Sequence, residues 1–223
     1  IETMSLFLGK IHYWLYNKIQ WAEKTEQALI HWATGQGLPA QQWAREARQK
    51  YGDPTGGRAL EEIVDTSNIH GSLQHFISCV ELRQADLITR ILEANPSHLD
   101  ELVKVNLAVG TAASDAYLTR PENHGSQLDS PDLLFLALQD YVLEGMPCDR
   151  VNQVVSETDQ EYVWATTTCL HTQYWQQVGG DVNNYYVLRD AWVKGFIQKL
   201  NSSYQYEKLG AASYGIVKKE GAA

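Results

Sequence analysis

The chain has 223 residues, 44% of them hydrophobic and 20% charged, with a formal net charge of −9. This balance is typical of a globular protein with a sizeable core, and the acidic excess argues against nucleic-acid binding, which needs a basic face. No apolar run approaches the ~20 residues that a membrane-spanning helix needs, so a membrane protein is not expected.

Two long amphipathic helices are predicted in the first half of the chain. Apolar residues such as Leu8, Leu15 and Ile19 recur at helical spacings and predict a helix over residues 5–34. A second long helix over 69–94 follows the polar residues 65–68, which are good N-cap types. Shorter helices are expected over residues 40–51, 59–64 and 97–118.

The second half of the chain differs in residue composition and in its predicted elements. The loop-like stretch 119–132 is the expected domain boundary, and a helix should follow over 131–145. Residues 161–170 are rich in strand-forming types, 184–200 should be helical, and 203–219 should form a hairpin around Gly210–Ala212. The predicted class is mainly α with a small antiparallel sheet (α+β): a helical bundle region at 4–120 and an α+β region at 128–223.

The two long helices share a pattern that bears on metal binding. Residues 11–30 and 69–88 are identical at seven of twenty aligned positions, including the pairs His12/His70 and Glu23/Glu81. In parallel helices His12 and His70 would lie level and could hold a divalent metal with a third ligand such as His171. In antiparallel helices each histidine would instead meet a glutamate in a structural pair. Either way, both histidines should be largely buried beside a polar partner.

A second spacing also suits a metal. His75 and Cys79 are four residues apart on one helical face, although no further ligand near them in the sequence completes a set. Helix packing is the alternative explanation for this pair.

The stretch 166–180 has the highest density of potentially reactive side chains in the sequence. If a strand runs to residue 170, Cys169 and His171 share a face at its end, where a thiol beside an imidazole could act as nucleophile and base. A zinc set of Cys148, Cys169 and His171 is a further alternative. The structural alternative predicts that Cys169 is mostly buried and reacts slowly, because apolar burial suppresses the thiolate.

Aromatic residues crowd the last sixty positions. Packing accounts for most of them, but a pocket lined by such rings would suit a small flat ligand. The candidate ligand-binding residues are Trp164, Trp175, Tyr185, Arg189 and Trp192.

Two family resemblances follow from these motifs. The long helices with inward His and Glu resemble DinB-like and hemerythrin-like four-helix bundles, which implies a bundle with a metal centre. The segment from Cys169 through the 184–200 helix to the hairpin resembles the L-2-amino-thiazoline-4-carboxylate hydrolase-like proteins, whose order is strand, cysteine, helix, helix and hairpin. This second resemblance implies a hydrolase with Cys169 at a strand end.

Three functional hypotheses remain from the sequence. The first is a small-molecule-binding or sensory module with a pocket between the helical and aromatic-rich parts. The second is a cysteine-dependent hydrolase or transferase at Cys169 and His171, and the third is a metal-binding bundle using His12 and His70. Three cysteines without framework spacing and no signal-like amino end predict a cytoplasmic protein, with a homo-oligomer as one expected state.

Overall fold

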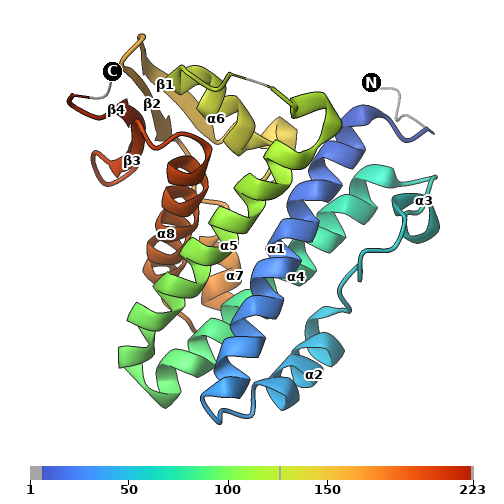
Figure 1. The fold of residues 1–223 in the computed structure, drawn as a ribbon. Helices are drawn as coiled ribbons and strands as arrows, with labels where there is room; N and C mark the ends of the chain where they lie inside the picture. The colour runs from blue at the N-terminus through green and yellow to red at the C-terminus, as the bar shows by residue number, and fades with distance from the viewer. Residues whose placement is uncertain (1–6, 126, 222–223) are drawn as a thin grey trace. The chain divides into compact units, whose positions relative to one another are not determined.

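The structure, a computed structural model, describes residues 7–125 and 127–221. Within them the chain forms eight α-helices and one four-stranded antiparallel sheet (Figure 1), which confirms the mainly α class with a small sheet. The helices are α1 (Lys10–Gly35), α2 (Ala40–Tyr51), α3 (Leu60–Ile63), α4 (Ile69–Ala94), α5 (Leu99–Thr119), α6 (Pro131–Gln139), α7 (Thr172–Gln177) and α8 (Val182–Leu200). The strands are β1 (Asn152–Glu157), β2 (Glu161–Thr166), β3 (Tyr204–Lys208) and β4 (Ser213–Lys218).

The chain is organised as two compact units, and each gathers segments that are far apart in the sequence. The first unit contains residues 1–96, 143–149 and 171–182, and the second contains 97–142, 150–170 and 183–223. This division differs from the expected single boundary between residues 120 and 128, because the chain passes from one unit to the other more than once.

The first unit is built on the pair of long helices. In it α4 packs against α1, α2 and α7. The apolar stripes predicted from helical periodicity form its core, to which Leu143 and Met146 are added from a later segment. The core side chains are Leu15, Tyr16, Ile19, Leu60, Val64, Ile69, Leu73, Ile77, Val80, Leu143 and Met146.

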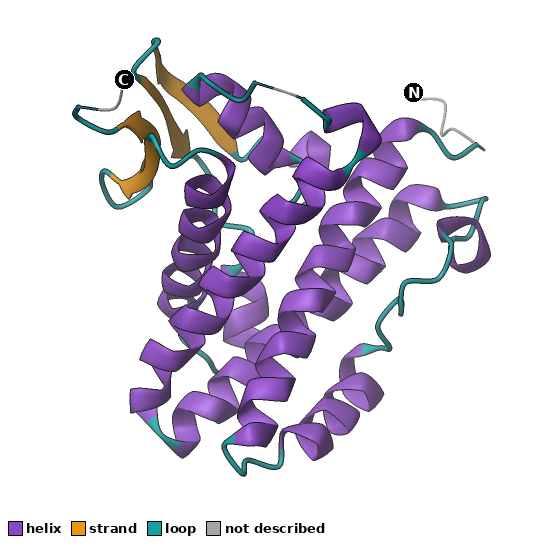
Figure 2. Ribbon diagram, viewed as in Figure 1, coloured by secondary structure: helices purple, strands orange, loops and turns teal. Residues whose placement is uncertain are grey.

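The second unit contains the sheet, which is orange in Figure 2. Its strands lie in the order β1-β2-β4-β3. The antiparallel pairing of β3 with β4 confirms the predicted hairpin. α6 packs on the sheet through Phe135, whose ring stacks on Tyr162 at 4.4 Å between centroids and lies 4.7 Å from Trp164. Two aromatic side chains of β2 therefore pack against α6.

Two glycines set the crossing of α5 and α8. A Cβ on Gly110 would lie 1.9 Å from the carbonyl oxygen of Trp192, and one on Gly195 would lie 2.2 Å from that of Leu107. Real Cβ atoms do not approach oxygen this closely, so each helix needs a glycine where it meets the backbone of the other.

β1 is an edge strand with an irregularity. Its pairing with β2 shifts register between Val154 and Ser156, so Val155 is the extra residue of a β-bulge. Val154 and Val155 are 49% and 63% exposed. The strand thus carries apolar side chains at its solvent-facing positions.

Several local predictions differ from the structure. α6 ends at Gln139 rather than near residue 145, since the chain then continues to Leu143 and Met146 in the core of the first unit. β1 was not predicted, and the short helix α7 was expected only through the second resemblance, whose order has a helix directly after the cysteine. Residues 5 and 6 of the expected first helix lie outside the described residues. Among the helices described, none combines the length and apolar character that crossing a bilayer requires.

Candidate functional site

The segment after β2 carries the reactive residues picked out in the sequence. β2 ends at Thr166, and the backbone N–H of Thr167 donates to the carbonyl of Val151 at 2.7 Å. The predicted strand to residue 170 is therefore too long, and Cys169 lies in a loop with an exposed side chain. The prediction that Cys169 is mostly buried is wrong, because the run of threonines leaves the sheet before reaching it.

The Cys169 sulfur has a specific partner in the second unit. The hydroxyl of Tyr186, in the second turn of α8, donates to Sγ at 2.8 Å. The guanidinium carbon of Arg189, one turn further on, lies 5.0 Å from the Tyr186 ring centroid and 4.6 Å from that of Tyr214. These cation–π contacts hold the donor ring against the sheet side of its helix.

Asp190 and Tyr206 extend this cluster. Tyr206 donates from its hydroxyl to Asp190 Oδ1 at 2.7 Å, and Arg189 Nη2 lies 3.7 Å from the same oxygen. Burial, above all, raises the pKa of Tyr206 well above its ordinary value, so this hydroxyl remains a donor at all physiological pH values. We call Cys169, Tyr186, Arg189, Asp190 and Tyr206 the thiol cluster.

His171 belongs to the first unit and is engaged there. Its side chain is 2% exposed, with Nδ1 3.0 Å from Glu81 Oε1 and Nε2 3.4 Å from Glu144 Oε2. Burial alone would lower its pKa, but the charges and hydrogen bonds of the two glutamates outweigh burial and raise the pKa to about 10. A protonated imidazole cannot accept a proton from a thiol, so the geometry does not support His171 as the base of a dyad.

The histidines proposed as metal ligands lie in other settings. His12 is half-buried, and its Nδ1 accepts the Gly9 N–H at 2.8 Å as part of the start of α1. His70 is exposed in the first turn of α4, so the prediction that both histidines are largely buried is wrong. In residues 7–125 and 127–221, no three His, Cys, Asp or Glu side chains are grouped so that they could hold a metal.

The two long-helix glutamates also have partners other than His12 and His70. Glu81 is paired with His171, which lies 90 residues away in the sequence. Glu23 accepts from the backbone N–H and the hydroxyl of Thr55 at 2.7 and 2.6 Å. Neither of the His–Glu pairings expected between the long helices is therefore needed to satisfy these carboxylates.

The five aromatic-pocket candidates divide by burial. Trp164, Trp175 and Trp192 are 6%, 1% and 7% exposed and belong to the cores of their units. Tyr185 is half-buried, with its ring in an edge contact with Tyr186 at 5.2 Å between centroids. Arg189 lies beside it in the thiol cluster. Of the five candidates, Tyr185 and Arg189 each contact Tyr186, the residue that donates to Cys169.

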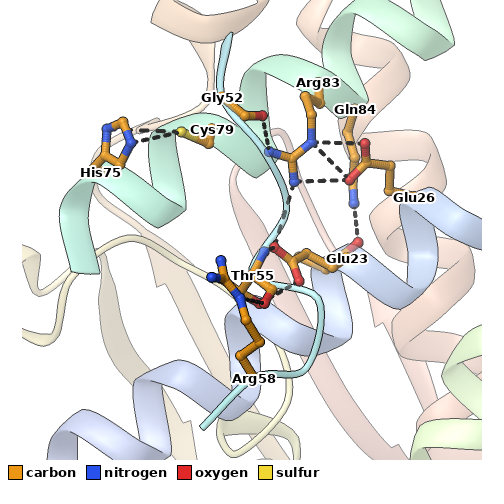
Figure 3. A network of polar contacts seen from close by, with 10 residues as sticks. Glu23, Glu26, Gly52, Thr55, Arg58, His75, Cys79, Arg83 and Gln84 are labelled. Carbon is orange, nitrogen blue, oxygen red and sulfur yellow. Dashed lines mark hydrogen bonds and ion pairs between the residues drawn. The ribbon is translucent and has the colours of Figure 1, made fainter. Parts of the chain in front are cut away.

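Sequence reasoning missed a buried ion network on α1 and α4, which Figure 3 shows. Arg83 is 1% exposed and donates from Nε and Nη2 to the two carboxylate oxygens of Glu26, at 2.9 and 3.1 Å. It also donates from Nη1 to the Gly52 carbonyl at 2.9 Å and lies 3.6 Å from Glu23. The sequence feature that could have revealed this network is Arg83 itself, which lies between the apolar residues of the α4 stripe.

Comparison with known proteins leaves the resemblances drawn from the sequence as predictions. No family model, curated protein or solved structure matches the chain.

Proposed function

We propose that the chain acts on a small molecule through the thiol of Cys169, as a cysteine-dependent hydrolase or transferase. The observation that carries this proposal is the 2.8 Å hydrogen bond from the Tyr186 hydroxyl to an exposed Cys169 sulfur. A donor directed at sulfur stabilises the thiolate, which is the nucleophilic form of cysteine.

The proposed chemistry has two steps. The Cys169 thiol loses its proton to solvent, the thiolate attacks an electrophilic carbon of the substrate to form a carbon–sulfur bond, and the bond to the leaving group breaks as that group takes a proton from water. Water in a hydrolase, or a second acceptor in a transferase, then attacks the same carbon, the carbon–sulfur bond breaks, and the sulfur leaves as thiolate, which takes a proton from solvent to restore the thiol. The Tyr186 hydroxyl donates to the Cys169 sulfur whenever the sulfur carries negative charge. Arg189 holds the Tyr186 ring in place for that contact.

A second candidate function is small-molecule binding without turnover, as in a sensory module. The observation that favours it is the edge contact of the half-buried Tyr185 with Tyr186, which offers an aromatic surface for a flat ligand. In that case Cys169 would contribute to binding but form no covalent bond.

The chain provides its own controls for testing thiol reactivity. Cys148 is exposed and reports solvent access alone, whereas Cys79 is buried, and burial above all raises its pKa. Under limiting iodoacetamide, mass spectrometry should find Cys169 alkylated first, Cys148 later and Cys79 last. Tyr186→Phe keeps the ring but removes the donor, and it should slow only Cys169. Equal rates at Cys169 and Cys148, unchanged by Tyr186→Phe, would contradict the proposal.

A metabolite screen distinguishes the two functions. Compounds that raise the melting temperature would be incubated with the wild-type protein and with Cys169→Ser, followed by intact-mass and product analysis. Turnover or a covalent adduct in the wild type alone indicates the enzyme. Equal stabilisation of both proteins, without adduct or product, indicates the binding module.

A further inference from the structure

The Arg189 guanidinium contacts three side chains of the second unit. Its carbon lies 5.0 Å from the ring centroid of Tyr186 and 4.6 Å from that of Tyr214. Its Nη2 lies 3.7 Å from Asp190 Oδ1, and only 8% of the Arg189 side chain is exposed. The charged group is therefore committed to contacts inside the unit rather than to solvent.

The approach of Asp190 to Arg189 does not follow from the helix itself. Successive residues of an α-helix point about 100° apart and do not face each other. Asp190 is instead fixed from another element, because the Tyr206 hydroxyl on β3 donates to Asp190 Oδ1 at 2.7 Å. The oxygen that Tyr206 binds is the one that lies nearest the guanidinium.

The β3–β4 hairpin supplies both the hydroxyl and one of the rings. Tyr206 pairs with Ile216, two residues from Tyr214, so the two tyrosines are diagonal neighbours across the strands. Their rings are parallel to within 9°, with 6.1 Å between centroids. One ring of this pair contacts Arg189, and the hydroxyl of the other holds the carboxylate beside it.

These contacts form a continuous path to the thiol. Arg189 contacts the Tyr186 ring, and the Tyr186 hydroxyl donates to Cys169 Sγ at 2.8 Å. We propose that Asp190 and Tyr206 are positioning residues for the Cys169 thiol, which fix Arg189 and through it the Tyr186 donor. This inference rests on the proposed function, in which the hydrogen bond from Tyr186 stabilises the thiolate.

The sign of the effect separates positioning from a direct influence of charge. If Asp190 acts through Arg189, its loss leaves the Tyr186 donor less well aligned and destabilises the Cys169 thiolate. If its negative charge acts on the sulfur directly, its loss stabilises the thiolate. A change that removes the charge of Asp190 but keeps its shape therefore distinguishes the two.

The pH dependence of Cys169 alkylation by limiting iodoacetamide, followed by mass spectrometry in the full chain, reports the thiolate. Tyr206→Phe keeps the stacked ring and removes the donor. It should raise the midpoint of the profile by about half a unit to one unit, or about 3- to 10-fold less thiolate at neutral pH. Asp190→Asn keeps an acceptor for Tyr206 and should shift the midpoint in the same direction. The profile of Cys148 should not change.

Tyr204→Phe is the matched control on the same face of β3. The Tyr204 hydroxyl donates to the Asp129 carbonyl at 2.6 Å, so this variant also loses one hydrogen bond from a buried tyrosine. It should lower the melting temperature as Tyr206→Phe does and leave the Cys169 profile unchanged. Asp190 is 23% exposed in its side chain, so Asp190→Asn should fold even if Tyr206→Phe does not.

A double variant tests the path itself. Tyr206→Phe added to Tyr186→Phe should cause no further shift, because its influence passes through Tyr186. A further shift there, an unchanged midpoint in Tyr206→Phe, a lowered one in Asp190→Asn, or an equal shift in Tyr204→Phe would overturn the inference. If Tyr186→Phe alone shifts the midpoint, the proposed function stands without this inference. No shift in Tyr186→Phe contradicts the proposed function itself.

Discussion

The two units of this chain stabilise their interiors by different means. In the first, charged groups are buried: Arg83 with Glu26, and His171 between Glu81 and Glu144. In the second, aromatic rings and direct backbone contacts fill the interior, as where Gly110 meets Trp192. Buried ions are costly to desolvate and depend on their partners, whereas close packing depends on volume alone. The stability of the first unit should therefore change when a buried charge is removed or the pH is changed. The stability of the second unit should change when atoms are added to its interior.

The largest expected effect is the loss of a charge from the first unit. Arg83→Met leaves Glu26 and Glu23 without their cation, and it should cost ~3–5 kcal/mol of unfolding free energy in urea titrations. Lys104→Met breaks an exposed, solvent-screened ion pair with Glu101 and should cost far less stability. The charge-based account fails if the two variants lose similar stability. It also predicts that Arg83→Met combined with Glu26→Leu is more stable than Arg83→Met alone.

A single methyl group should also lower stability, this time in the second unit. Gly110→Ala would place its Cβ against the Trp192 carbonyl and force α5 and α8 apart, at a cost of about 1–3 kcal/mol. Gly35→Ala is the matched control, because open space surrounds that position at the end of α1. It should be neutral or stabilise by up to ~1 kcal/mol. Equal melting temperatures for the two variants would contradict the close crossing.

The third test of the comparison between the two units is the dependence of stability on pH, which changes gradually. In the folded protein the pKa of His171 is raised to about 10, above the roughly 6.5 expected in the unfolded chain. The charged imidazole therefore contributes its full stability below about pH 6.5, and this contribution is lost as the pH rises toward 10, by about 1.4 kcal/mol per pH unit at most.

Urea unfolding of the wild type and His171→Gln between about pH 6.5 and 9.5 measures this slope. The wild type should lose stability relative to the variant across the window. In the second unit Tyr141, whose pKa burial raises to about 12, should not titrate in this range. Parallel curves for the two proteins would show that His171 is not held as a cation.

The elements that the sequence predicted correctly are those defined by local patterns. Helical periodicity located α1 and α4, and the β-branched and aromatic residues on either side of a short small-residue loop located the β3–β4 hairpin. The six-residue helix α7 was too short for periodicity to reveal. The edge strand β1 has exposed residues along most of its length and lacked the burial pattern of a strand.

The candidate site depended on contacts that no local pattern encodes. The strand before Cys169 ends where Thr167 bonds to Val151, and the ring of His171 meets a carboxylate 90 residues earlier. Tyr186 was within the aromatic-rich segment, but only the fold turns its hydroxyl toward the sulfur. Residue types thus identified Cys169 and Arg189 as candidates, whereas the partners that determine their chemistry came from tertiary structure.

The bulge at Val155 also affects how the protein behaves among its own copies. An edge strand that exposes Val154 and Val155 would be a template for intermolecular pairing and fibre growth if its outer hydrogen-bonding groups formed a regular row. The extra residue breaks that row in the middle of the strand, between Val154 and Ser156. The irregularity therefore makes this edge a poorer template for pairing between copies of the chain.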